Sequence, residues 1–266
     1  MKILIANDDG VYSLGIYALA KAMRDAGHDV RIVAPNSERS GAGHSMTMFA
    51  PIEVFDVTLH GLEDVPCYAI SGTPVDCIKL GAGNLFDMPD LVITGINTGT
   101  NLGCDIYGSG TVNAAAAAIE KGLPALALSI GAHHPKNLDV AAEIAVNAVH
   151  KLLPQLEGLG TLISINIPDL PRNEIKGVKI TPIARPNPNY PFNEFISPRN
   201  RRWYWDSASP LNVYEPDEDV DNRWYKEGYV TVTAIKFDIL DRPAMEVLKN
   251  TDHGLLPRSV RNRSKR

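Results

Sequence analysis

Short apolar runs alternate with helical patterns along the first 170 residues of this 266-residue chain. The runs lie at 2–6, 29–35, 67–70, 90–97, 124–130 and 161–167. They are too short for helices and show little polar alternation, which is typical of central parallel strands that are covered on both faces.

Helical patterns fill the intervals between these runs. Apolar residues from Ile16 to Met23 recur at helical spacing before Gly27, which we expect just past the end of the helix. "TPVD" (73–76) reads as the capping box of a second helix, the alanine-rich stretch 112–120 as a third, and 140–152 as a fourth. The alternation predicts an α/β protein with a Rossmann-like, doubly wound, mainly parallel sheet.

The pattern changes after residue 171. Residues 182–215 are rich in proline, asparagine and aromatic residues, and 227–240 alternate as in a long strand. We therefore expect a Rossmann-like core at 1–171 and an extension of hairpins and arms at 172–266. The aromatic triplet 203–205 needs a covering surface, so the extension is expected to contact a second copy.

Composition narrows the classes of partner. Hydrophobic residues make up 44% of the chain and charged residues 21%, with a net charge of -5, which argues against nucleic acid as a partner. The basic end at 258–266 is expected to be a solvated tail. Three cysteines without CxxC spacing suit a reducing compartment. No apolar stretch is long enough to span a bilayer and no leader pattern is visible, so a cytoplasmic protein is expected.

Two adjacent carboxylates, Asp8 and Asp9, follow the first predicted strand in the segment "NDDG". Like charges this close repel, so the pair needs an explanation. One explanation is that Asp9 or Ser13 caps the next helix, which leaves the other acid without a role. The other is a divalent cation, because Mg²⁺ and Mn²⁺ prefer hard carboxylate oxygens. The residues favour a bound cation, and a helix cap stays open as the alternative.

Two neutral oxygen donors follow other predicted strands. Ser40 belongs to "NSERSG" and Asn97 to "TGINTG". In an open parallel sheet, the loops after the carboxyl ends of strands meet in one crevice, so both side chains are expected near Asp8 and Asp9. Each alone is typical of a turn or a cap, but with the two acids they form a mixed oxygen site for a metal ion.

The segment "YGSGTVN" opens a predicted helix and offers groups that suit an anion. The Ser109 and Thr111 hydroxyls and the backbone amides around Gly110 can hold a phosphate at a helix N-terminus. An ordinary helix cap explains the same residues, and neither a P-loop nor GxGxxG is present. Asn101 is a further donor. His44 is either structural or a group that donates to a phosphate oxygen or protonates a leaving group.

Five segments together resemble one family, the stationary-phase survival protein SurE. They are "ILIANDDG", "APNSERSGAGHSMT", "SGTPVDCIKLG", "DLVITGINTGTNLG" and "GSGTVNAA". They occur in the family's order and at near-family spacing over about residues 1–130. "GYVTVTAI" resembles a late strand of the family. One such segment is weak evidence, whereas five in register are specific.

The resemblance implies a Rossmann-like fold and hydrolysis of nucleoside 5'- and 3'-monophosphates with one divalent ion, Mg²⁺ or Mn²⁺, per subunit. It also implies a C-terminal arm exchanged between subunits, so a homodimer or homotetramer is expected. The family's residues fall on positions singled out above: Asp8, Asp9, Ser40 and Asn97 as metal ligands, and Ser109 and Thr111 in the active site. Either Asp8 or Asp9 is a candidate proton acceptor.

The chain departs from the family pattern at three places. Gly108 stands where an aromatic residue usually precedes Ser-Gly-Thr, and "VYSLGI" lacks the usual proline. Asn113 and the run Ala114–Ala118 replace a more typical pattern of glycine, alanine and methionine-glutamate. The metal ligands are intact, so we expect activity with an altered pocket for the base or leaving group.

Three other functions match parts of the sequence. A phosphatase that forms a covalent aspartyl-phosphate needs two acids two residues apart, whereas the acids here are adjacent. A non-catalytic nucleotide-binding module would use Asp8 and Asp9 only as caps. A glycosyltransferase-like sugar-nucleotide enzyme has no particular residue in its favour.

Overall fold

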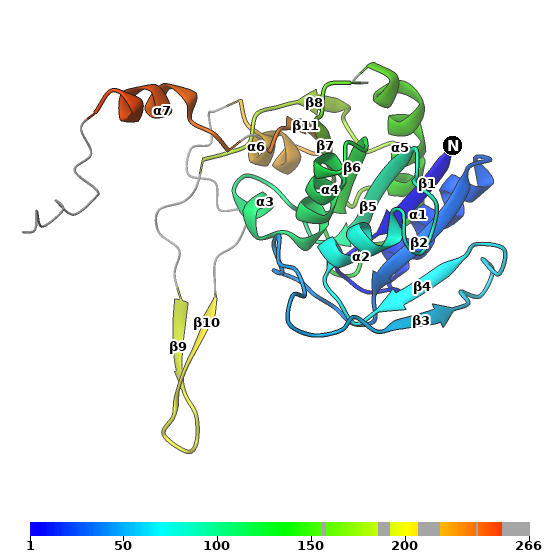
Figure 1. Ribbon diagram of the computed structural model, residues 1–266, viewed down its shortest axis with the longest axis horizontal. Coiled ribbons are helices and arrows are strands. Elements are labelled where there is room, and N and C mark those ends of the chain that lie inside the picture. The colour runs from blue at the N-terminus through cyan, green and yellow to red at the C-terminus, as the bar shows by residue number, and fades with distance from the viewer. Residues whose placement is uncertain (156–157, 186–191, 207–218, 238, 252–266) are drawn as a thin grey trace, which may run out of the picture. The chain divides into compact units, whose positions relative to one another are not determined.

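The chain folds around a nine-stranded sheet with the strand order β3-β4-β2-β1-β5-β6-β7-β11-β8 (Figure 1). The computed structural model describes residues 1–155, 158–185, 192–206, 219–237 and 239–251. The strands of the sheet are β1 (Lys2–Ala6), β2 (Asp29–Pro35), β3 (Val54–Val57), β4 (Cys67–Ile70), β5 (Leu91–Thr98), β6 (Ala125–Ile130), β7 (Leu162–Ile167), β8 (Val178–Ile180) and β11 (Val230–Ile235). The six from β4 to β7 in this order are mutually parallel, while β3 and β11 are antiparallel to their neighbours β4 and β7. The predicted mainly parallel sheet is confirmed.

Two layers of helices cover this sheet. The helices are α1 (Leu14–Asp25), α2 (Pro74–Gly81), α3 (Asp105–Gly108), α4 (Gly110–Glu120), α5 (Leu138–Lys151) and α6 (Asp221–Lys226), with a 3-10 turn η1 (Leu153–Gln155). α1 packs on α5, and α2 packs on α4. In β1, Ile3 and Ile5 join the core that includes α1, while Leu4 contacts Gly81 of α2. Both faces are therefore buried, as the apolar runs predict.

The predicted helix signals have visible physical causes. The Ser13 hydroxyl accepts from the backbone amide of Ile16 at the start of α1. At α2 the capping box of Thr73 and Asp76 is present, with proline at the first helical position. In α4 the side chains of Ala114–Ala118 are all fully buried, so this helix lies close between α2 and the sheet.

The strand order reverses direction between β1 and β5. From β1 the chain proceeds through β2 and β4 to one side, then returns to β5 and continues through β6 and β7 on the other side. Loops that leave β1 and β5 at their carboxyl ends therefore separate, which is where open α/β sheets form their ligand crevice. The segments that carry Asp8 and Asn97 leave the sheet here.

The main sheet does not stop at residue 171. β8 and β11 complete it, and the compact unit runs from Met1 to Lys236. The long strand expected at 227–240 is observed as Val230–Ile235, and β9 (Phe192–Ile196) and β10 (Arg202–Asp206) form a separate antiparallel hairpin. Parts of the aromatic-rich segment 182–215, namely 186–191 and 207–215, lie outside the described residues, as does the basic tail at 258–266.

A second unit begins at Phe237. Its helix α7 (Arg242–Lys249) starts at Asp241, whose carboxylate accepts from the amide of Ala244. Apolar side chains of α7, such as Val247 and Leu248, are exposed. Within the described parts of the chain, no helix has the length and apolar character needed to cross a membrane.

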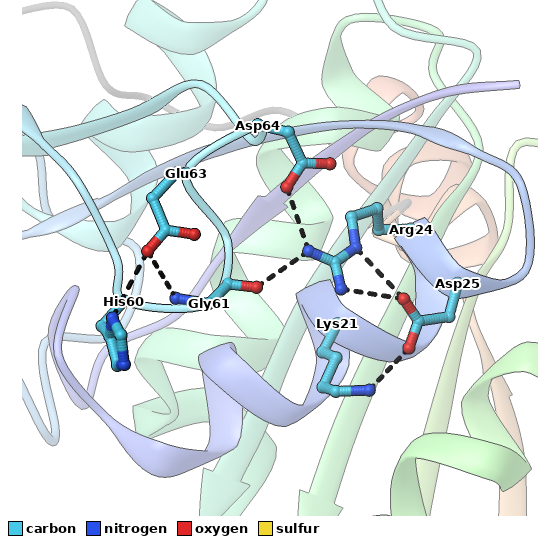
Figure 2. Close-up of polar contacts among 7 residues, drawn as sticks. All are labelled: Lys21, Arg24, Asp25, His60, Gly61, Glu63 and Asp64. Atoms are coloured by element: carbon cyan, nitrogen blue, oxygen red, sulfur yellow. Dashed lines mark hydrogen bonds and ion pairs between the residues drawn. The ribbon is translucent and has the colours of Figure 1, made fainter.

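A polar network joins the end of α1 to the loop before β4 (Figure 2). The Arg24 guanidinium donates to the Gly61 carbonyl at 2.9 Å, to Asp64 at 3.0 Å and to Asp25 at 2.9 Å, and Lys21 donates to Asp25 at 2.6 Å. We call these five residues the Arg24 cluster. Hydrogen bonds from Lys21 and Arg24 lower the pKa of Asp25. The positive charges of Lys21 and Arg24 therefore balance the negative charges of Asp25 and Asp64 within the cluster.

Candidate active site

The turn after β1 is braced by Asn7. Its side-chain nitrogen donates to the Gly10 carbonyl at 3.0 Å and to the Ser13 hydroxyl at 2.7 Å, and its oxygen accepts from the Gly10 amide at 3.2 Å. Ser13 in turn caps α1 through Ile16. The cap is therefore Ser13 and not Asp9, so both acids of the pair need another role.

Asp8 is buried against the first turn of α4. Its side chain is 4% exposed, and the Thr111 hydroxyl donates to its Oδ1. Gly110 makes this approach possible, because a Cβ atom there would lie 2.7 Å from the Asp8 Cβ and 2.8 Å from Oδ2. The strand end and the helix N-terminus are thus in direct contact, as the clustering of strand-end loops predicts.

Asp9 is held at the end of β5, the strand that carries Asn97. The Thr98 amide donates to Asp9 Oδ2 at 3.1 Å and the Thr98 hydroxyl to Oδ1 at 3.2 Å. The Asn97 side-chain nitrogen donates to the Gly99 carbonyl at 2.8 Å, which leaves the amide oxygen as the donor atom for a cation. Both side chains are thereby held in fixed orientations.

Ser40 reaches the same place from the loop after β2. The backbone amide of Arg39 donates to the Asp8 carbonyl at 2.7 Å, which anchors this loop beside the paired acids. The Ser40 hydroxyl donates to Glu38 Oε1 at 2.7 Å and keeps its lone pairs as an acceptor. The four predicted metal ligands come from three strand-end loops that the fold brings together.

A cleft of about 340 Å³ lies between these loops. It is lined among others by Asp8, Ser40, Asn97, Asn101, Asp105 and Ser109. The sequence patterns do not single out Asp105, because nothing around it distinguishes it from an ordinary loop acid. The cleft therefore contains most of the predicted residues and one further carboxylate.

Burial makes the pair of acids electrostatically costly. Desolvation raises the pKa of Asp8 to about 6, the Thr111 hydroxyl works against this, and the charge of Asp9 adds to it. The pKa of Asp9 is raised mainly by desolvation, which the Thr98 hydrogen bonds oppose. Across the described residues, no ion pair involves either acid. Such a pair favours a bound cation.

The donor set suits a hard divalent ion that keeps several waters. It comprises two carboxylates, one hydroxyl and one amide oxygen, and magnesium sites commonly use few protein carboxylates. No cluster of three or more histidine, cysteine or acidic side chains with metal-binding geometry occurs in the described part of the chain. A softer ion such as zinc, which prefers such clusters, fits the site less well.

The start of α4 is where the sequence predicts an anion cradle. The Ser109 hydroxyl accepts from the Val112 amide at 3.1 Å as the helix cap, and Ser109 lines the cleft. The buried Asn113 side chain donates to the Ile106 carbonyl at 2.9 Å and the Ser109 carbonyl at 2.8 Å, which fixes the turn before the helix. The hydroxyl of Thr111 is directed to Asp8 and not into the cleft.

Asn101 lies at the cleft wall, but its side chain is engaged within the fold. Its nitrogen donates to the Ser129 hydroxyl at 2.7 Å, and its backbone exchanges hydrogen bonds with the Asn166 side chain at 2.8 and 3.0 Å. These bonds tie the glycine-rich turn after β5 to β6 and β7. Phosphate binding by Asn101 stays a prediction.

His44 is not among the residues that line the cleft. Its Nε2 lies 3.1 Å from the Glu120 carboxylate, at the last residue of α4. A single loop histidine in the sequence does not reveal which neighbour it faces, so the catalytic interpretation of His44 had no means to exclude this pairing.

Comparison with known proteins decides the family. The family Survival protein SurE matches residues 3–189. The chain belongs to the SurE family. The resemblance expected from the five segments is thus confirmed, and the match covers the cleft, the paired acids and the start of α4.

Relatives and a solved structure extend this result over nearly the whole chain. Proteins named 5'-nucleotidase SurE from Synechococcus elongatus and Desulfitobacterium hafniense are each 39% identical, covering 90% and 94% of this chain and 95% and 97% of those proteins. The crystal structure of the SurE protein from Aquifex aeolicus aligns with a TM-score of 0.80 at 33% identity, over 94% of this chain and 99% of that one. The SurE-family fold therefore includes β8 and β11.

Proposed function

We propose that this SurE-family chain is a metal-dependent phosphomonoesterase that hydrolyses nucleoside 5'-monophosphates, with 3'-monophosphates as further substrates. The observation that carries the proposal is the acidic couple Asp8–Asp9, in which Asp8 is buried in contact with the N-terminus of α4 and neither acid forms an ion pair among the described residues. A cation at the acids and an anion at the helix is the arrangement that phosphoryl transfer requires. The names of the relatives agree with this chemistry.

One divalent ion per subunit, Mg²⁺ or Mn²⁺, would be held by Asp8, Asp9, Ser40 and Asn97. When bound, such an ion supplies Lewis acidity toward a phosphoryl oxygen and lowers the pKa of water. The protein's part is to orient these ligands. Asp8 is fixed through Thr111, Asp9 through Thr98, and the Asn97 amide through the Gly99 carbonyl.

The phosphoryl group would lie at the start of α4. Ser109 accepts from the helix, so its own hydroxyl hydrogen can donate to a phosphoryl oxygen. The backbone amides at Gly110 and beyond add the partial positive charge of the helix N-terminus. Donors fixed before the substrate arrives stabilise the charge that develops in the transition state. We assign Thr111 to the orientation of Asp8, and we assign His44 no catalytic role.

We also propose that the protein is a homodimer or homotetramer with an exchanged C-terminal arm. The β9–β10 hairpin supports association, since Phe195, Trp203 and Trp205 are each more than half exposed. Aromatic side chains of this kind are enriched at protein interfaces. Size-exclusion chromatography with light scattering tests the assembly. The cytoplasmic location expected from the cysteine content stays a prediction.

Phosphate release from a panel of nucleoside 5'- and 3'-monophosphates, each with Mg²⁺, Mn²⁺ or a chelator, tests the proposed activity. We expect hydrolysis that requires the metal and prefers a nucleotide to a simple sugar phosphate. Manganese should also raise the melting temperature, because a ligand that binds only the folded state stabilises it. An unchanged melting temperature together with no phosphate release would leave a non-catalytic module as the function.

A single-turnover experiment in ¹⁸O-water, combined with an acid quench, separates direct hydrolysis from an aspartyl-phosphate route. Attack of water on phosphorus puts the label into the released phosphate. A covalent route also puts the label into phosphate when water attacks the phosphorus of the aspartyl-phosphate, and it labels the protein only when water attacks the carboxyl carbon. The phosphorylated protein itself, trapped by acid quench, is therefore the second readout, and its appearance would contradict our proposal.

A further inference from the structure

Asp76 does more than cap a helix. It is 5% exposed in the first turn of α2, and its carboxylate accepts from the Thr73 amide at 2.9 Å, as a capping box requires. The same carboxylate also accepts from the Thr47 amide, at 3.0 and 3.2 Å to its two oxygens. Gly72 leaves room for it, since a Cβ there would lie 2.8 Å from Oδ2.

Thr73 makes a second attachment to the same loop. Its hydroxyl donates to the Ser45 carbonyl at 2.7 Å while accepting from the Asp76 amide at 3.1 Å. Thr73 therefore binds the Ser45 carbonyl and Asp76 binds the Thr47 amide, so the two members of the capping box together hold residues 45–47. We call this pair of attachments the α2 clamp. The α2 clamp joins segments that are distant in sequence, since Thr47 and Asp76 are 29 positions apart.

The loop held by the α2 clamp is the one that carries Ser40. Its other anchors include the Arg39 amide on the Asp8 carbonyl at 2.7 Å and the Gly43 amide on the Gly108 carbonyl at 2.9 Å. The Ser40 hydroxyl bonds to Glu38 in the same loop, and that bond does not tie Ser40 to the rest of the protein. Ser40 is exposed, so backbone anchors and not packing must define its position.

We propose that Asp76 is a positioning residue for the metal site and that it acts through Ser40. With Thr73 it fixes residues 45–47, which shortens the free span of the loop and holds the Ser40 hydroxyl beside Asp8. Groups that orient a metal ligand contribute to affinity even though they do not touch the ion. This role rests on the proposed function, because it presupposes that Ser40 binds the metal.

Titration calorimetry with Mn²⁺ alone, without substrate, tests the proposal. The main variant is Asp76→Asn, because an amide has one acceptor oxygen where the carboxylate has two, and its NH2 group then faces the Thr47 amide, which also donates. The matched control is Val75→Ala, which removes a fully buried side chain from the same helical turn and leaves the α2 clamp in place. The third comparison is Asp76→Asn in a Ser40→Ala background.

We expect Asp76→Asn to weaken Mn²⁺ binding by about 10- to 100-fold, the range typical of groups that orient metal ligands. Val75→Ala should lower the melting temperature and keep the affinity for Mn²⁺. In the Ser40→Ala background the effect of Asp76→Asn should largely vanish, because two residues that act through one another are not additive. Equal losses in both backgrounds, or an unchanged affinity, would overturn the role of Asp76.

Further variants make the result unambiguous. If Asp76→Asn does not fold, Thr73→Val and Thr73→Ser replace it: the valine variant should lose affinity and the serine variant, which keeps the hydroxyl, should retain it. Equal affinities would overturn the proposal. If the wild-type protein binds no Mn²⁺, the proposed function fails together with this role. If Asp9→Asn abolishes binding while Asp76→Asn keeps it, only the role of Asp76 fails.

Discussion

The two ends of helix α1 carry acidic residues in opposite electrostatic situations. At its C-terminal end the Arg24 cluster surrounds Asp25 and Asp64 with an arginine and a lysine (Figure 2). Before its N-terminal end, Asp8 and Asp9 are adjacent and form no ion pair among the described residues. The ends are about 18 Å apart for a helix of 12 residues.

The direction of the pKa shifts separates the two situations. The pKa of Asp25 is lowered by donors from Lys21 and Arg24, whereas burial raises the pKa of Asp8 to about 6. A cluster that serves the fold supplies its own countercharge. A site that binds a cation keeps its acids charged at a cost to the free energy of unfolding, which the ligand then offsets.

The largest expected difference between the two ends is in activity. Asp9→Asn should reduce phosphate release by more than about 100-fold, because a metal ion contributes several kcal/mol to stabilising the transition state. Asp25→Asn, an identical substitution in the Arg24 cluster, should leave turnover unchanged. Steady-state kinetics at saturating Mn²⁺ measures both. Near-wild-type turnover by a folded Asp9→Asn variant would contradict the assignment of the site.

The next effect is on the stability of the metal-free protein. The folded-state pKa of Asp8, about 6, exceeds the ordinary value of 3.8, so the native protein binds a proton that the unfolded chain has released. The free energy of unfolding should therefore fall as pH rises from about 4 to about 6, by about 2–3 kcal/mol for this group. Asp8→Asn removes the titrating carboxyl and with it this pH-dependent fall in the free energy of unfolding.

Urea denaturation in the presence of a chelator measures this effect as the difference between Asp8→Asn and wild type at each pH. The variant should gain relative stability as pH rises through that window and should lose the stabilisation by Mn²⁺. A pH-independent difference would show that Asp8 is not forced to ionise in a buried setting.

A smaller effect is expected at the anion cradle. Ser109→Ala removes the cap of α4, which costs about 1 kcal/mol of stability, and removes a donor to the phosphoryl group. We expect a rise in KM for the nucleotide with Mn²⁺ affinity retained. Thermal denaturation measures the loss of stability, and paired titrations with substrate and with Mn²⁺ measure KM and the metal affinity. An unchanged KM would restrict Ser109 to the role of a helix cap.

The smallest effect is expected in the Arg24 cluster. Arg24→Gln should lower the melting temperature by less than about 4 °C, because exposed ion pairs contribute little to stability. The decrease should shrink further in high salt, which screens exposed charges. Differential scanning calorimetry at two ionic strengths checks this. A large, salt-independent decrease would mean that the Gly61 contact, and not charge, holds the loop.

The sequence predicted the elements whose causes are local. The runs at 2–6 and 29–35 became β1 and β2 at the same bounds, and Ser13 and Thr73 capped helices for reasons visible within four residues. β3 and β8 were missed because their side chains are largely exposed and their place depends on pairing with distant strands. Such pairing leaves no periodicity in the chain.

In the candidate site, too, some features were predictable from the sequence and others were not. The fold rule that gathers strand-end loops was enough to bring Asp8, Ser40 and Asn97 to one cleft. The direction of a side chain was not predictable, so Thr111 was expected in the cleft but donates to Asp8, and His44 faces Glu120. The hydrogen bond from Thr47 to Asp76 was not predictable either, because the two residues are remote in sequence.

The buried alanines Ala114–Ala118 have a consequence for how the enzyme meets its substrate. The helix is tightly packed along this stretch, and its first turn is in direct contact with Asp8, so the two form one close-packed unit. Little reorganisation energy is then spent when a nucleotide docks. Accommodation of differently shaped nucleosides must come instead from the surrounding loops, which is where altered selectivity should be engineered.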